Sequence, residues 1–397
     1  MKKFGIMISL VFISFSFMFF CGCTHEMVSL YIYKMPNKLV YEIGEELDLT
    51  GLELKNIKTD SALLKIYNNK ANFSGFDSQT SGKKEVSISY GEFTTSFTVY
   101  VASKIVSTNE ELKTAIENAN DNDIILIKEG NYKLNSPLEI QNSNIVIGGE
   151  GKDKTIIDSF VILGGYLDAR SINYSGTIEN ISFISVGFET KNSTENNIIK
   201  FENENLNQDF ACINAKDISS LNVLSCGFKG YSLAIKAQNL KNAFISSNTM
   251  NSLLIGGIET TNSTQNVSIS KNIINMIGTN VVNVSKQSYQ DYIFGIKLAL
   301  NSEDNLGISI YKNSISKIAG KTGSLKYFNE KIEGDLNGLN YMNKSGAIII
   351  YSTLKNNLQT KGVSIFFNSI GATLNNILYN TTTSNRVNSS SVMYMSL

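Results

Sequence analysis

Several residue types that commonly build active sites are scarce in this chain. Its 397 residues include two prolines, no tryptophan and one histidine, His25. A single histidine leaves no histidine–cysteine cluster with ligand spacing, so the sequence predicts no metal centre of that kind. Only 18% of the residues are charged and the formal net charge is zero. The chain therefore lacks the basic stretches that would indicate a nucleic-acid partner.

Apolar residues at helical spacing are also nearly absent, which argues against helical and leucine-rich solenoids. Instead, one short phrase returns: apolar, any, apolar, any two residues, Asn, any, apolar. Its four clean copies contain Asn248, Asn272, Asn313 and Asn368. Two earlier copies, around residues 183 and 223, lack the asparagine. The step between second apolar residues is 22 residues from 223 to 245 and 24 from 245 to 269. A period in this range indicates stacked coils.

Alternation inside each phrase predicts short strands with one buried face. Stacked strands of this kind form a right-handed parallel β-helix, whose valines and isoleucines would share one core. We expect each asparagine to adopt a left-handed backbone conformation at a bend and to hydrogen-bond the asparagine one coil away. Cys212 and Cys226 are predicted as buried thiols, with a disulfide as the alternative.

The first residues have the form of an export signal. Lys2 and Lys3 precede an apolar run at 4–20, which is too short and too early for anything else. The pair Gly22-Cys23 then resembles the lipobox of bacterial lipoproteins. This resemblance implies a signal peptide at 1–22, lipidation of Cys23, a tether at 23–28, and an exported protein anchored in the bacterial envelope by its acyl chains. The alternative is ordinary secretion.

Residues 29–101 alternate polar and apolar side chains in short runs separated by turns, which predicts a small β-sandwich. The stretches 36–52, 73–78 and 86–90 closely resemble bacterial immunoglobulin-like domains, which usually serve as spacers or protein-binding modules. We expect no catalytic residue in this part of the chain.

Residues 107–119 predict a short amphipathic helix opened by a capping box, either Ser107 with Glu110 or Thr108 with Glu111. The strand and Gly130-x-Tyr132 turn that follow resemble the amino-terminal start of pectin-lyase-like β-helix proteins. The predicted fold is therefore all-β: an immunoglobulin-like β-sandwich, then at 102–397 a right-handed parallel β-helix capped by a short α-helix.

A second set of strands precedes the asparagine phrases. Aligning them puts four polar residues on one solvent-facing column, with Lys200 beside it: Asn214, Lys236, Glu259 and Lys297. Stacked at the spacing of successive coils, these side chains would suit an extended glycan. The alternative is an ordinary solvated sheet face. Two insertions, at 289–292 and 320–344, are candidate binding loops that include Tyr327 and Tyr341.

The pectin-lyase-like resemblance implies polysaccharide lyases and hydrolases, each of which needs particular catalytic residues. A hydrolase needs two suitably spaced carboxylates, but the column holds one, Glu259. Asp168 and Arg170 are isolated in an early coil. A lyase would use Lys236 or Lys297 as its base near Glu259, and only then would Ca²⁺ be expected as a cofactor.

We therefore expect a monomeric, surface-exposed, lipid-anchored protein that binds a glycan or a surface protein without catalysis, its sandwich lifting the β-helix off the membrane. No other cofactor and no metal site are expected. The rival hypothesis is a lipid-anchored polysaccharide lyase, and a third is a purely structural envelope protein.

Overall fold

The computed structural model describes residues 27–58, 63–66, 68–134, 136–140, 142, 144–159, 161–163, 174–184, 188–191, 198–201, 211–231, 233–253, 255–277, 281–282, 293–300, 306–318, 345–352, 363–373, 377–383 and 386–387. The predicted signal peptide, Cys23 and both candidate binding loops lie outside these ranges. Within them, no helix is long and apolar enough to cross a membrane.

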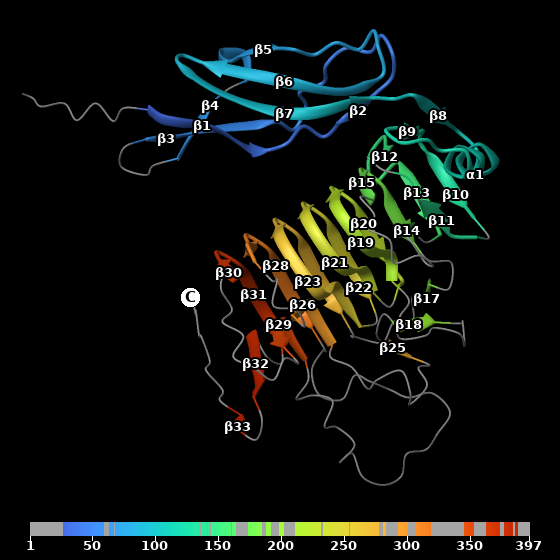
Figure 1. Cartoon of the computed structure of the whole chain (residues 1–397), viewed down its shortest axis with the longest axis vertical. Helices are drawn as coiled ribbons and strands as arrows, with labels where there is room; N and C mark the ends of the chain where they lie inside the picture. The colour runs from blue at the N-terminus through green and yellow to red at the C-terminus, as the bar shows by residue number, and fades with distance from the viewer. Residues whose placement is uncertain are drawn as a thin grey trace, which may run out of the picture.

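The amino-terminal part is a sandwich of two small sheets, drawn in blue in Figure 1. One sheet consists of β1 (Met27–Lys34), β3 (Glu53–Lys58) and β4 (Leu63–Ile66). The other consists of β2 (Val40–Tyr41), β7 (Phe93–Val101), β6 (Gly82–Tyr90) and β5 (Asn72–Ser74), with a short 3-10 turn, η1 (Asn68–Lys70), before β5. Alternate residues such as Val86, Ile88 and Val99 are buried against Tyr41 and Leu54. This confirms the predicted sandwich.

Most of the remaining described chain is a parallel β-helix with three columns of strands. Column one consists of β11 (Leu138–Ile140), β14 (Val161–Leu163), the first halves of β19 (Ala211–Leu224), β21 (Leu233–Ser246) and β23 (Gly256–Ser270), then β26 (Ile293–Leu300), β29 (Ser345–Ser352) and β32 (Ile377–Thr383). β33 (Arg386–Val387) pairs antiparallel with β32.

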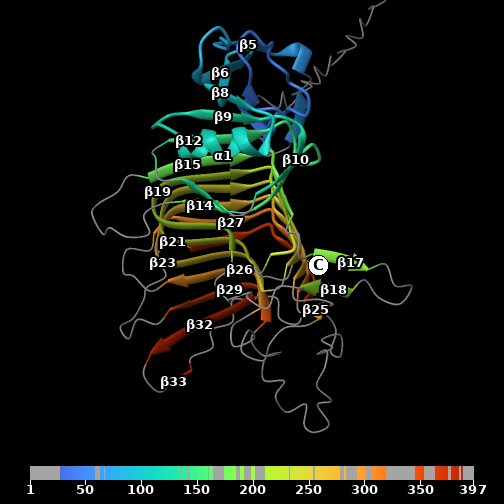
Figure 2. The same cartoon turned by 90° about the vertical axis from the view of Figure 1, so that its right-hand side faces the viewer.

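Column two begins with β8 (Lys104–Val106), β9 (Ile124–Ile127), β12 (Ile145–Gly149) and β15 (Tyr174–Glu179). It continues through the second halves of β19, β21 and β23 to β27 (Ile308–Tyr311) and β30 (Val363–Phe366). Column three consists of β10 (Gly130–Lys133), β13 (Thr155–Asp158), β16 (Ser182–Ile184), β20 (Gly227–Lys229), β22 (Thr249–Leu253), β24 (Ile273–Ile277), β28 (Ser314–Ile318) and β31 (Ser369–Thr373). Figure 2 shows the strands stacked coil upon coil.

One continuous apolar core runs through the described coils, because all three columns contribute inward apolar side chains. Most are isoleucine, valine and leucine, and Tyr132, Phe183 and Phe228 take such positions in column three. Cys212 and Cys226 are both fully buried in it as free thiols, which confirms the prediction of buried thiols. Burial raises the pKa of Cys212 well above its ordinary value, although a hydrogen bond with Tyr231 opposes the shift. This thiol is therefore a packing group.

The repeated asparagines form a ladder at the bend between columns two and three. The Oδ1 of Asn272 accepts bonds from the backbone N and the Nδ2 of Asn248, at 3.0 and 2.9 Å, and Asn313 and Asn368 repeat the pattern. The predicted contact between coils is thus confirmed. The predicted backbone conformation is wrong, because the left-handed residue is the one before each asparagine, for example Lys271 at φ +56°. The asparagine itself points inward, where its amide satisfies buried backbone groups.

Helix α1 (Asn109–Glu117) covers the first coil. Of the two predicted pairs, the structure has Thr108 with Glu111: Thr108 is the N-cap, and its Oγ1 accepts from Glu111 N at 3.2 Å. The Glu111 carboxylate reaches one residue beyond the cap of an ordinary capping box and accepts from Ser107 N at 2.7 Å. Leu112, Ala115 and Ile116 are buried in the common core. The helix therefore shields the apolar end of the stack, as predicted.

The sandwich joins the β-helix without a long linker, since only residues 102 and 103 separate β7 from β8. Val40 and Ala102 pack with Ile124 and Val146 of the first coils. Further along, Leu224 packs against the core of the sandwich. The sandwich therefore lies against the side of several coils as well as at their end (Figure 1).

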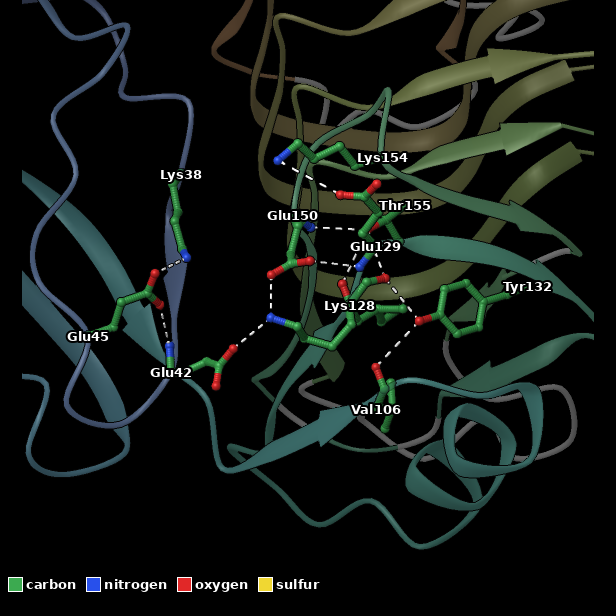
Figure 3. A network of polar contacts seen from close by, with 11 residues as sticks. Lys38, Glu42, Glu45, Val106, Lys128, Glu129, Tyr132, Glu150, Lys154 and Thr155 are labelled. Carbon is green, nitrogen blue, oxygen red and sulfur yellow. Dashed lines mark hydrogen bonds and ion pairs between the residues drawn. The ribbon is translucent and has the colours of Figure 1, made fainter.

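Lys128 is the centre of a polar network at this junction, shown in Figure 3. Its Nζ donates to Glu42 of the sandwich at 2.7 Å and to Glu150 of the next coil at 2.5 Å. These hydrogen bonds, first that with Glu150 and then that with Glu42, raise the pKa of Lys128 far above its ordinary value. Burial alone would raise the pKa of Glu150. The hydrogen bonds that its carboxylate accepts from Lys128 and from Glu129 N outweigh burial, so the pKa of Glu150 is lowered.

Acid should weaken this junction. The lowered pKa of Glu150 means that its contribution to stability is present above the ordinary carboxyl pKa and is lost as pH falls through the folded-state value. Between about pH 6 and pH 3 we expect the wild type to lose up to about 1 kcal/mol more stability than Glu150→Gln, a small amount because the pair is partly exposed. Lys128 contributes nothing to this window, because its raised pKa matters only in alkali.

Urea denaturation followed by circular dichroism at several pH values would measure this difference. Glu117→Gln is the matched control, because the Lys113–Glu117 pair is exposed and 3.8 Å long. Equal acid sensitivity in Glu150→Gln and the wild type would contradict the assignment.

Candidate functional site

The polar column expected from the sequence is present on column one. The strand register pairs Asn214 with Lys236, Lys236 with Glu259, and Glu259 with Lys297. Ile162 and Ile349 take the equivalent positions in the adjoining coils. The alignment made from the sequence is therefore confirmed for these four residues.

Lys200 does not lie beside this column, contrary to expectation. It belongs to β18 (Ile198–Phe201), which pairs antiparallel with β17 (Phe188–Lys191) and parallel with β25 (Val281–Val282). These strands form a separate small sheet that projects from the side of the coils in Figure 2. Only 14 residues separate positions 200 and 214, too few for a whole coil, so the 198–201 strand pairs elsewhere.

A stack of small residues two positions before the polar column holds successive coils close together: Cys212, Ala234, Gly257, Gly295 and Ala347. A Cβ on Gly257 would lie 2.6 Å from Gly295 O and 3.1 Å from a methyl group of Ile274. The same change at Gly295 would place a Cβ 2.6 Å from Ala347 O. Because no side chain fits at either glycine, the coils keep a tight register and the polar residues follow one another at about 4.8 Å.

Glu259 and Lys297 form a buried ion pair, so the expectation that both face solvent was wrong. Their carboxylate and ammonium groups lie 2.8 Å apart. Glu259 is 8% exposed and Lys297 is 5% exposed. Burial of two charges is tolerable here because each compensates the other at one coil spacing. Alternation in the sequence identified the outer face but could not reveal that this part of it is covered.

Phe294 adjoins the pair. Its ring takes the space above Gly256, where a Cβ would lie only 2.2 Å from the ring, and its centroid lies 5.3 Å from Lys297 Nζ. The ring therefore adds a cation–π contact to the ion pair. Asn214 and Lys236, farther along the column, are half-buried. Sequence reasoning missed Phe294, because nothing in the pattern distinguishes it from a core aromatic.

These contacts limit the acid–base chemistry that the outer face of column one can perform. Lys297 already donates to a carboxylate, which favours its charged form over the neutral amine that a general base needs. Two carboxylates take this register among the described residues: Glu259, which belongs to the ion pair, and the exposed Glu139 of β11, two coils before Asn214. No group of three or more histidine, cysteine or acidic residues that could hold a metal ion occurs within the described ranges.

Other candidate residues fall outside the described residues: Tyr327, Tyr341, Asp168, Arg170 and the lipidation site Cys23. For Lys200 the structure gives the strand pairing alone.

Comparison with known proteins supports the amino-terminal domain. Residues 35–101 match the family model "Bacterial Ig-like domain (group 3)". The curated protein pectate lyase L of Thermoclostridium stercorarium is 36% identical over 78 residues, which is 20% of this chain and 6% of that protein. The chain thus spans a small fraction of the curated relative that it matches.

Similar solved structures are distant. They include the pectin methylesterase of Erwinia chrysanthemi, 11% identical with a TM-score of 0.32, covering 68% of this chain and 89% of the other. The family 28 exopolygalacturonase of Yersinia enterocolitica is 8% identical with a TM-score of 0.33, covering 85% and 73%. The catalytic domain of a GH87 α-1,3-glucanase is 12% identical with a TM-score of 0.37, covering 90% and 74%.

Proposed function

We propose that this protein is an exported, lipid-anchored envelope protein that binds an extended polysaccharide on the outer face of column one without cleaving it. The proposal rests on Asn214 and Lys236, which pair in register on neighbouring coils and are both half-buried. The Glu259–Lys297 pair farther along the column is covered, so it offers a bound polymer neither a free acid nor a free base. Asn214 and Lys236 are assigned to contacts with sugar hydroxyl and acid groups.

A polysaccharide lyase is the second candidate, favoured by the similarity to pectate lyase L. In such an enzyme Lys236 would be the base, because it is half-buried whereas Lys297 is covered and so out of reach of a sugar. The described residues of column one do not fit a calcium ion, since Ca²⁺ takes six to eight oxygen ligands and the two carboxylates of the column lie several coils apart. Glu259 is paired with the Lys297 ammonium, and Glu139 lies at the same register in β11.

The lipid anchor is supported by the Gly22-Cys23 pair after the apolar run at 4–20. Labelling of cells with a radioactive fatty acid should mark the wild type and leave Cys23→Ala unlabelled. Label on both proteins, or on neither, would refute the anchor.

Binding on column one can be tested with residues 24–397, which contain every described element. In affinity electrophoresis with a panel of uronate polysaccharides, we expect retardation by at least one polymer and no absorbance from new double bonds. Lys236→Ala should weaken binding about tenfold, the loss of one charge-assisted contact. Lys241→Ala is the matched control, an exposed lysine outside the column. New double bonds that disappear in Lys236→Ala would establish the lyase instead.

A further inference from the structure

A second polar cluster lies where the sandwich meets the turn edge between columns two and three. The ring of Tyr33, in β1, has three lysine ammonium groups around it. Nζ of Lys55 lies 3.2 Å from the ring centroid, that of Lys271 5.5 Å and that of Lys312 5.7 Å. Lys55 comes from β3, and the other two come from successive coils of the β-helix. In Figure 1 the end of β1 lies above this edge of the coils.

The cluster carries positive charge that acidic groups do not match. Within the described residues, none of the three ammonium groups forms an ion pair with a carboxylate. Burial, and then repulsion by Lys312, lowers the pKa of Lys271, and the opposing influence of Tyr311 and Glu53 is smaller. Lys55 and Lys271 are half-buried and Lys312 is exposed, so the three ammonium groups repel one another through partly screened surroundings, and an anion that joins them relieves this repulsion.

The bend position that holds Lys271 and Lys312 holds an aromatic residue in the next coil. The residue before each bend asparagine has a left-handed backbone, and in three successive coils these residues are Lys271, Lys312 and Phe367. Phe367 is 80% exposed. Its neighbour Phe366 stacks on Tyr311 with the ring centroids 5.0 Å apart and the planes 4° apart. A left-handed conformation is unfavourable for Lys and Phe, so the fold alone does not account for these residue types.

We propose that this cluster, the seam strip of Tyr33, Lys55, Lys271, Lys312 and Phe367, binds a strand of anionic polysaccharide. The ammonium groups would pair with its carboxylate, sulfate or phosphate groups, and the exposed aromatic rings would pack against the apolar faces of the sugar rings. Successive coils present Lys271, Lys312 and Phe367 about 4.8 Å apart, in line with a chain molecule that carries repeated charges. This site lies on a different edge of the β-helix from column one.

Lys271 also has a structural task, because its Nζ donates to Tyr33 O and so ties the sandwich to the coils. Lys312 and Phe367 are the better positions to test, since the structure gives the Lys312 ammonium no hydrogen bond to a described residue. Asparagine is the replacement of choice, because it tolerates the left-handed conformation that both residues adopt, at φ +55° and +53°. Lys317→Asn is the matched control: an exposed lysine with φ +53° on β28, outside the strip.

The experiment measures binding of polygalacturonate to residues 24–397 by calorimetry in a Lys236→Ala background, which separates this site from column one. We expect Lys312→Asn and Phe367→Asn each to weaken binding about fivefold to tenfold, and Lys317→Asn to leave it unchanged. Binding should also fall with added salt, and less steeply in Lys312→Asn. Urea midpoints equal to that of the parent would show that folding is intact.

Three results would overturn the proposal. One is the absence of any binding to polygalacturonate in the Lys236→Ala background. Another is full binding in the Lys312→Asn/Phe367→Asn double variant. The third is equal affinity for a DNA oligonucleotide of similar charge together with no effect of Phe367→Asn, because attraction would then depend on charge alone. If the wild type binds polygalacturonate and the Lys236→Ala protein does not, the seam strip is refuted, and the proposed function of column one still stands.

Discussion

Replacing Asn272 by alanine is expected to lower the free energy of unfolding by about 3–5 kcal/mol, because several buried polar groups lose their partners together. Asn272 is fully buried. Its Nδ2 donates to Ile245 O at 3.0 Å and to Asn313 Oδ1 at 2.9 Å. Without the side chain, Asn248 also loses the acceptor for both its backbone N and its amide.

Urea denaturation followed by circular dichroism would measure the loss, which is a practical choice because the chain has no tryptophan to report fluorescence. Asn251→Ala is the control: this side chain is half-buried and accepts one bond, from Ser252 Oγ at 3.0 Å. We expect the control to cost about 1 kcal/mol or less. A cost of that size for Asn272→Ala would mean that the ladder contributes little to the stability of the stack.

Truncation of Lys297 to alanine is expected to cost about 3–5 kcal/mol, because it leaves the Glu259 carboxylate buried and unpaired. The side chains of the pair are 6% and 10% exposed, so water cannot take the place of the ammonium without rearrangement. The double variant Glu259→Gln/Lys297→Met removes both charges while keeping similar volume. We expect it to be within about 1–2 kcal/mol of the wild type.

A double-mutant cycle on Glu259 and Lys297, measured by urea denaturation, would give the coupling between them. Lys317→Ala, at an exposed position, controls for loss of a lysine side chain in a strand. If Lys297→Ala kept wild-type stability, the pair would be a solvated surface contact, and the argument that it is unsuited to base catalysis would fall with it.

The repeat was readable from the sequence because each coil must solve the same packing problem. Inward positions need apolar residues such as Val223, Ile245 and Ile269, and the bend needs an amide that satisfies buried backbone groups. The constraint recurs once a coil, so the period, the strands and the polar column of Lys236, Glu259 and Lys297 all followed from alignment alone.

The backbone conformation of individual residues within a bend could not be predicted from the sequence. The left-handed conformation was expected at the asparagines, but it belongs to Ser247, Lys271, Lys312 and Phe367, which come just before them. Backbone preference singles out asparagine, whereas the inward hydrogen bonds decide where its side chain must point. Lys200 was misplaced for a related reason: an apolar–polar–apolar strand does not specify its pairing partner.

By itself, the sequence determined the β-sandwich, the stack of coils, the capping helix and the order of residues along column one, since all of these depend on local periodicity. Only the tertiary structure decided that Glu259 and Lys297 are covered, and that Tyr33 meets Lys271 and Lys312 from more than 200 residues away. Local periodicity predicts which face of a strand a side chain lies on. Which distant segment covers that face cannot be predicted from local periodicity, because the two segments share no sequence pattern.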